Sequence, residues 1–172
     1  MYMYVQRKPL QASGGKARRT KQNERSDQTK SNMKEYAYQL RMKVRDYECD
    51  MEGIVNNANY QHYMEHTRHE FLLQAGISFA EMLEQGIVSV VARITIDYKM
   101  PLRSRDEFLS CLSISQEGVR YVFHQDIYRA SDMKLAARGK VDVVCLVDGK
   151  LSRCPGLEEK LNSYMEVKEE VK

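Results

Sequence analysis

The hydrophobic positions of this chain follow first a period of two and then a helical period. Between Tyr38 and Asp46 apolar residues alternate with polar ones, which is typical of a strand with one buried face. From Ala58 the apolar residues recur at helical spacing, and Gly76 supplies a stop signal. The positions on that helical face are Tyr60, Tyr63, Met64, Thr67, Phe71 and Ala75. The pattern therefore predicts an early strand followed by one long helix.

The second half of the chain favours strands. Ser78–Gln85 reads as a short second helix, with Ser78 as its cap and Gly86 at its end. Four β-rich runs separated by turn residues follow at 87–99, 107–115, 120–129 and 134–147. A helix is expected over Leu157–Val167. One strand, a long helix and a later meander predict an α+β fold in which a curved antiparallel sheet wraps around the central helix.

Charge divides the chain unevenly. Residues 1–32 hold eight Lys or Arg and two acids, whereas the remaining 140 residues hold 19 and 22. Such a segment has too little apolar surface to offset its ordering entropy, so we expect a disordered basic tail over 1–32, a folded domain over 33–155, and a helix or tail over 156–172. The tail could bind nucleic acid, act as a targeting peptide or attract an acidic carrier protein by its charge, but a solvated tail is the simplest interpretation.

Composition narrows the class of protein. A chain of 172 residues with 42% hydrophobic content suits one compact domain. Its four cysteines show no C-x-x-C spacing, which favours reduced thiols and a cytoplasmic protein, or a plastid protein if the basic tail is a transit segment. No apolar run approaches the roughly 20 residues that span a bilayer, and no phosphate loop or nucleic-acid motif occurs. We expect neither a membrane nor a nucleic acid as partner.

Candidate chemistry lies between the first strand and the long helix. Asp50 precedes Gly53, which can adopt the positive φ of a sharp reversal. Asn56, Asn57 and Asn59 then stand where helix caps belong, and a helix N-terminus offers free N–H groups to an electron-rich oxygen. An Asp before a glycine turn can also simply bind local backbone, so the residues alone leave both interpretations open.

Asp50, Gly53, Val55, Ala58 and Tyr60 match a D-x-x-G-x-V-x-x-A-x-Y pattern. In this the chain resembles the 4-hydroxybenzoyl-CoA thioesterase-like hotdog family, and its longer string from 44 to 72 is similar to single-hotdog acyl-carrier-protein thioesterases of plastids. The resemblance implies a hotdog fold, hydrolysis of acyl-CoA or acyl carrier protein thioesters, and a homodimer or homotetramer. It implies no metal and no cofactor.

The same resemblance assigns the site residues. The catalytic carboxylate falls on Asp50, as general base or as nucleophile, and the contact to the thioester carbonyl falls on the backbone N–H of Asn57. Gly53, Val55, Asn59 and Tyr60 are the expected substrate-binding positions, although Asn59 can equally be a cap and Tyr60 a core residue.

Other interpretations remain open. His62, Glu65, His66 and His69 share one helix face at metal-ligand spacing, but without an H-E-x-x-H order. Cys49 could be a nucleophile, although inert packing is favoured, and Arg103 with Arg105 could meet phosphates of a carrier. A hotdog hydratase or dehydratase and a non-catalytic acyl-binding module are the alternative functions.

Overall fold

The computed structural model describes residues 36–165 of the chain. Its strands are β1 (Tyr38–Lys43), β2 (Ile87–Tyr98), β3 (Glu107–Glu117), β4 (Arg120–Arg129), β5 (Leu135–Val147) and β6 (Lys150–Ser152). Its α-helices are α2 (Asn57–Gln74), α3 (Phe79–Glu84) and α4 (Pro155–Leu161), and its 3₁₀-helices are η1 (Asp46–Glu48) and η2 (Asn162–Tyr164). The predicted tail over 1–32 lies outside the described residues, so its disorder stays a prediction.

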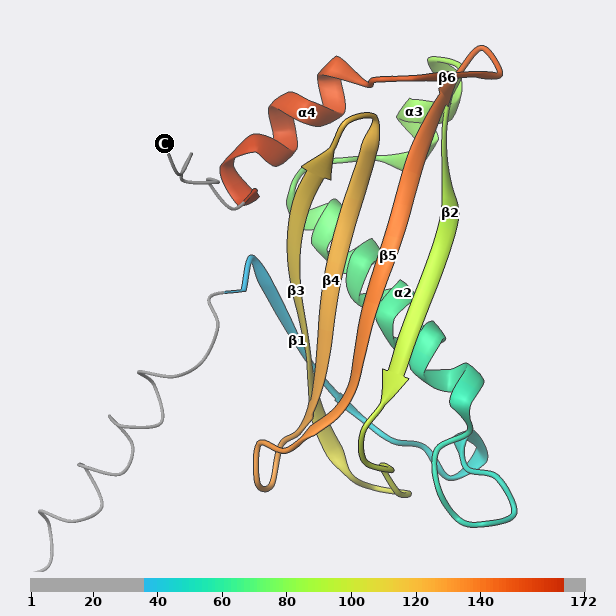
Figure 1. Ribbon diagram of the computed structural model, residues 1–172, viewed down its shortest axis with the longest axis vertical. Coiled ribbons are helices and arrows are strands. Elements are labelled where there is room, and N and C mark those ends of the chain that lie inside the picture. Colours follow the sequence, from blue (N-terminus) through green and yellow to red (C-terminus); the bar gives the residue numbers. More distant parts are fainter. Residues whose placement is uncertain (1–35, 166–172) are drawn as a thin grey trace, which may run out of the picture. The chain divides into compact units, whose positions relative to one another are not determined.

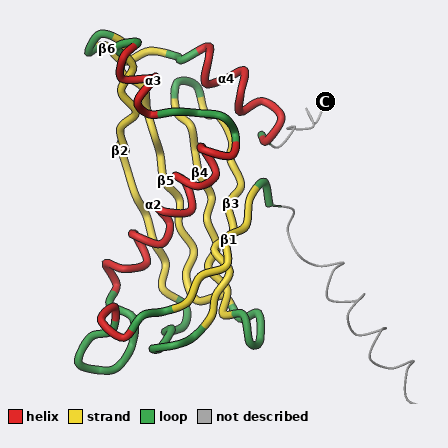
Figure 2. Tube along the Cα trace, turned by 180° about the vertical axis from the view of Figure 1, so that it is seen from behind, coloured by secondary structure: helices red, strands yellow, loops and turns green. Residues whose placement is uncertain are grey.

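The strands form one antiparallel sheet in the order β1-β3-β4-β5-β2, and β6 pairs with β5. Long-range pairing places β1, the first strand, beside β3, and places β2 at the opposite edge (Figure 1). Helix α2 crosses one face of this sheet, as seen from the other side in Figure 2. The antiparallel sheet and the long central helix predicted from the sequence are confirmed.

The core lies between α2 and the sheet. One apolar cluster joins the second half of α2 to the α3 and α4 end of the domain, with Phe71 and Leu112 fully buried. A second cluster joins the start of the helix to the loops beside it and includes Val55, Tyr60 and Leu102. These two clusters fix α2 along its length, and its first turn is therefore held in place next to the β1–α2 connection.

Gly139 permits the close approach of α2 to β5. A Cβ atom at this position would lie 2.5 Å from the Met64 sulfur, whereas real Cβ contacts are longer. Because glycine carries no side chain, the Met64 thioether can pack directly over the strand backbone.

Two predicted elements end at other residues in the structure, and one short strand is not predicted by the sequence. The first strand ends at Lys43 rather than Asp46, because the chain turns into η1. The three-residue strand β6 has too few positions to display a period and was not predicted. Helix α4 ends at Leu161 and is followed by η2, while the end of the expected helix at Val167 lies outside the described residues.

Candidate active site

Asp50 sits in a tight turn between η1 and α2. The Asp50 N–H donates to the Ile54 carbonyl at 2.9 Å, and the Gly53 N–H donates to the Asp50 carbonyl at 3.0 Å. Gly53 has φ of +71°, the left-handed conformation expected from the sequence. Cys49 and Val55 pair as an isolated antiparallel bridge beneath this turn. The backbone therefore reverses within four residues, and Asp50 is the first residue of the turn.

The Asp50 carboxylate is held by the turn itself. Its Oδ1 accepts the Glu52 N–H at 3.1 Å and the Ile54 N–H at 3.4 Å, and the residue is half-buried. No hydrogen bond within residues 36–165 engages Oδ2. One oxygen thus fixes the orientation of the carboxylate, while the second has no hydrogen-bond partner among the described residues.

The first turn of α2 begins directly after this loop. The Asn56 side chain accepts the Ala58 N–H at 3.0 Å, and the Asn56 carbonyl accepts the Asn59 N–H at 2.9 Å. The Asn57 N–H has no acceptor among the described residues, and the Asn57 side chain is exposed. An uncapped N–H at a helix N-terminus carries partial positive charge and can stabilise a developing oxyanion.

Glu48 joins the Asp50 loop to α2, and sequence analysis did not single it out. Its carboxylate is buried, with Oε2 accepting the Tyr63 hydroxyl and the Arg45 N–H, both at 2.7 Å, and Oε1 accepting Arg45 Nη1 at 3.2 Å. Its backbone carbonyl accepts the Asn56 N–H at 3.0 Å and the Asn59 side-chain amide at 2.7 Å. One residue therefore connects η1 to both the cap and the second turn of the helix.

Burial and the Glu48 hydrogen bond both raise the pKa of Tyr63 above its ordinary value, with burial the larger cause. The Tyr63 hydroxyl accordingly keeps its proton and acts as the donor to the carboxylate. The sequence gives one signal for this contact. It places a glutamate two residues before Asp50 and a tyrosine on the predicted buried face of the helix.

The predicted substrate-binding residues fall into two groups. Val55 and Tyr60 are buried, and both bind Leu102: the Val55 N–H donates to the Leu102 carbonyl at 2.8 Å, and the Leu102 N–H donates to the Tyr60 hydroxyl at 3.0 Å. Gly53 lies on the exposed turn, and the Asn59 amide braces Glu48. Contacts of these four residues to substrate stay predictions. Within the protein, the hydrogen bonds of Val55, Tyr60 and Asn59 stabilise the segments next to the Asp50 turn.

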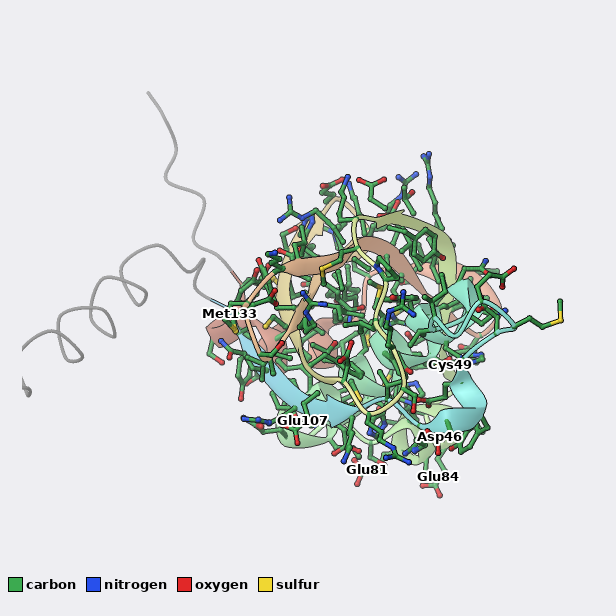
Figure 3. The ribbon with its side chains drawn as sticks, turned by 90° about the horizontal axis from the view of Figure 1, so that it is seen from below. Asp46, Cys49, Glu81, Glu84, Glu107 and Met133 are labelled. Atoms are coloured by element: carbon green, nitrogen blue, oxygen red, sulfur yellow. The ribbon has the colours of Figure 1, made fainter. Side chains whose placement is uncertain are left out.

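The connection from β2 to β3 lies against the Asp50 turn. Arg103 pairs with Ile54 as an isolated bridge, and the Arg105 N–H donates to the Val44 carbonyl at 3.1 Å. Both arginine side chains are exposed, as is that of Arg45. Asp46 and Cys49, labelled in the view from below, lie in the connection from β1 to α2 (Figure 3). Three guanidinium groups thus come from segments that adjoin the candidate site.

The helix histidines have separate surroundings. His62 Nδ1 lies 3.4 Å from Asn59 Oδ1, whereas the His69 ring packs edge-on against Phe79 with centroids 5.3 Å apart. Within residues 36–165, no group of three or more His, Cys, Asp or Glu side chains is arranged to hold a metal ion. All four cysteines are free thiols, and Cys49 alone of them is half-exposed.

The helices of the described region are too short or too polar to cross a bilayer.

The chain is similar in sequence to thioesterases of plants and bacteria, and two relatives serve as examples. The chain is 37% identical over 105 residues to the chloroplastic acyl-acyl carrier protein thioesterase ATL3 of Arabidopsis thaliana, covering 59% of this chain and 55% of that one. It is 30% identical over 129 residues to the long-chain acyl-CoA thioesterase FadM of Escherichia coli, covering 74% and 96%. The chain thus spans little more than half the length of the plant relatives it matches.

Solved structures agree on the fold. A 1,4-dihydroxy-2-naphthoyl-CoA thioesterase from Synechocystis superposes with a TM-score of 0.67 at 20% identity, over 71% of this chain and 92% of that one. A probable thioesterase from Escherichia coli gives 0.66 at 29% identity, over 74% and 98%. The hotdog fold implied by the sequence resemblance is confirmed. Residues 44–163 match the model of the thioesterase-like superfamily, and the chain belongs to that family.

Proposed function

We propose that this protein hydrolyses acyl thioesters of coenzyme A or of an acyl carrier protein. The observation that carries the proposal is the succession of two features in the connection between η1 and α2. A carboxylate fixed through one oxygen lies at the start of the Asp50 turn, and the uncapped Asn57 N–H begins the helix that follows. Membership of the thioesterase-like superfamily supports the reaction class.

Asp50 supplies the base or the nucleophile. As general base, its free oxygen removes a proton from water as the water attacks the thioester carbonyl. As nucleophile, that oxygen attacks the carbonyl itself, expels the thiolate and leaves an acyl-aspartyl anhydride that water then hydrolyses. In either route negative charge develops on the carbonyl oxygen, and the Asn57 N–H stabilises it at the positive end of α2.

Asp50→Asn tests the assignment. The amide oxygen of Asn can still accept the Glu52 and Ile54 N–H groups, so the turn is preserved while the negative charge is removed. We expect thiol release from an acyl-CoA and acyl carrier protein panel to fall by at least about 10²-fold. Glu52→Gln is the matched control, because it neutralises an exposed carboxylate on the same turn and should leave turnover unchanged. Equal turnover in Asp50→Asn and wild type would refute the role of Asp50.

Solvent oxygen incorporated into Asp50 identifies the nucleophilic route, whereas label in the acid alone is common to general-base hydrolysis and to hydrolysis of the anhydride at its acyl carbon. In a single turnover in ¹⁸O-labelled water, general-base hydrolysis places the label in the released acid. Hydrolysis of an anhydride at its aspartyl carbon places the label in Asp50 instead. Mass spectrometry of the acid and of the peptide that contains Asp50 separates these outcomes.

We further infer a homodimer formed through β2. This strand of 12 residues pairs with β5 on one side and lies at the edge of the sheet on the other. Val88, Val90 and Val91 are exposed along it, and a long apolar edge strand offers unpaired backbone groups to which another chain can pair. Antiparallel addition of a second β2 would extend the sheet with twofold symmetry. Light scattering of Val90→Lys against wild type tests this, and unchanged mass in the variant would contradict it.

The alternative functions predict different outcomes with the same panel. A hydratase would add water to an enoyl thioester without releasing thiol, and an acyl-binding module would hold acyl-CoA without turning it over. Either result, obtained with folded protein, would replace hydrolysis as the proposed activity.

A further inference from the structure

Residues of α2, α3, α4 and the sheet line a cavity of about 140 Å³. Helices α3 and α4 both lie at one end of the sheet (Figure 1). The walls of the cavity are mostly apolar and come from helices and strands on several sides. The lining residues include Leu72 and Ile77 near the end of α2, Met82 of α3, Phe123 of β4, Val143 of β5 and Leu157 of α4. Three polar residues of α2, namely Glu65, Arg68 and His69, also line it.

Arg68 is a buried cation in this apolar setting. The residue is 6% exposed, and its Nη1 donates to the Gln125 side-chain oxygen at 2.9 Å. Gln125 is itself fixed, because its amide donates to the Met64 carbonyl at 2.8 Å. Within the part of the chain that the structure describes, Arg68 forms no salt bridge. Glu65 is exposed at the rim of the same cavity and acts on Arg68 through its charge without a direct ion pair. Burial lowers the pKa of Arg68 from its ordinary value.

A guanidinium in such a place favours an anionic partner. Burying a charge without a counter-charge costs several kcal/mol, and the neutral Gln125 oxygen satisfies one of five N–H donors. Water in the cavity could bind the remaining donors but would bring no negative charge. The planar fork of arginine matches the two oxygens of a carboxylate, and the apolar walls suit a hydrocarbon chain.

We propose that this cavity binds the carboxylate end of an aliphatic chain, with Arg68 as the anion-binding residue. Its volume is close to that of cavities that hold a six-carbon ring, so about six carbon atoms fit inside. Arg68 lies 11 residues after Asn57, or about 16 Å along the helix axis. The site is therefore distinct from the position proposed for the thioester carbonyl.

The carboxylate could come from two sources. It could be that of a free fatty acid, such as a product of hydrolysis. Alternatively, it could be the distal end of a dicarboxylic acyl group whose thioester lies at Asp50, and this source rests on the proposed function.

Binding of small ligands tests the site without any turnover. Isothermal titration calorimetry should show hexanoate binding about 10- to 100-fold tighter than hexan-1-ol, because the two differ in the charged group that Arg68 recognises. Arg68→Met should remove this preference, while Arg153→Met, at an exposed arginine, should keep it. Equal affinity for acid and alcohol in the wild type, or a preference unchanged in Arg68→Met, would overturn the proposal.

Gln125→Glu provides a second test should Arg68→Met fail to fold. The new carboxylate would lie where the Gln125 oxygen already contacts Arg68, so an internal ion pair would replace the ligand. We expect hexanoate binding to be lost in this variant although Arg68 is present. Retained binding would show that the guanidinium is not the recognition element.

Turnover distinguishes the two sources. Faster hydrolysis of dodecanedioyl-CoA than of dodecanoyl-CoA, abolished by Arg68→Met, would identify the distal end of the substrate. Equal hydrolysis of both, together with Arg68-dependent binding of hexanoate, would identify a free acid. If neither thioester is hydrolysed, the proposed function fails while the binding result still decides the site.

Discussion

Removing the Tyr63 hydroxyl should loosen the connection between the Asp50 loop and α2. In Tyr63→Phe the buried Glu48 carboxylate loses one of its three hydrogen-bond donors and keeps the two that Arg45 supplies. A hydrogen bond to a charged group contributes about 1.5–3 kcal/mol. Because the contact is 2.7 Å long and both residues are buried, we expect a loss of about 2 kcal/mol in the free energy of unfolding.

Urea denaturation measures this loss, and a double-mutant cycle with Glu48→Gln isolates the pair. The coupling energy between the two positions should be about 1–2 kcal/mol, within the range for residues in one hydrogen-bond network. Tyr47→Phe is the matched control, since this neighbouring tyrosine is 78% exposed, and its change should stay within about 0.5 kcal/mol. Equal effects of Tyr63→Phe and Tyr47→Phe, or a coupling near zero, would refute the role of Glu48 as a structural link.

A functional consequence follows from the short distance in sequence between Glu48 and Asp50. A displacement of about 1 Å at a catalytic group can cost about 10²-fold in rate. If the loop shifts, kcat for thioester hydrolysis should fall in Tyr63→Phe while the protein stays folded. Unchanged kcat would show that the turn holds Asp50 without help from α2.

Four further predictions address other parts of the molecule. Gly53→Ala should cost about 1–2 kcal/mol in unfolding experiments, because φ of +71° strains any residue with a Cβ, although the space beside it is open. Burial raises the pKa of the Cys111 thiol to about 12. Because the unfolded thiol ionises at about pH 8.5, the free energy of unfolding should fall as the pH rises above that value. Cys111→Ala should reduce the slope of this free energy against pH by up to about 1.4 kcal/mol per pH unit. Cys49 should react first with a thiol reagent under native conditions, and Cys49→Ala should keep hydrolysis near the wild-type rate. Arg103→Ala should raise KM for acyl-CoA with little change in kcat if its guanidinium meets a carrier phosphate.

The elements of the fold were largely readable from the sequence because each carries its own local signal. Helix α2 was expected from Ala58 and begins at Asn57, and Ser78 caps α3 by accepting the Glu81 N–H as anticipated. The Gly53 turn followed from conformational freedom that glycine alone has. Strand β6 escaped prediction because three residues paired to β5 depend on that pairing rather than on a period of their own.

The candidate site was readable only in part, because its support depends on contacts between distant residues. Asp50 and Asn57 could be named from their place beside a turn and a helix start. Glu48 could not, since its burial comes from Tyr63, 15 residues further along the chain. Arg68 left a fainter signal: it follows Met64 by four residues, on the buried side of the helix. A lone arginine there indicates either an internal partner or a ligand, and sequence alone cannot choose between them.

Under the proposed function, two acidic residues with different surroundings have different roles in the Asp50 loop. Glu48 has both oxygens engaged and is buried, so it has no atom left with which to meet a substrate. Asp50 has one oxygen engaged by its own turn and lies nearer the surface. A group that orients and a group that reacts need these opposite environments, because positioning requires saturated hydrogen bonds and proton transfer requires a free lone pair. For this reason loss of Glu48 should lower stability and rate together, whereas Asp50→Asn should lower the rate alone.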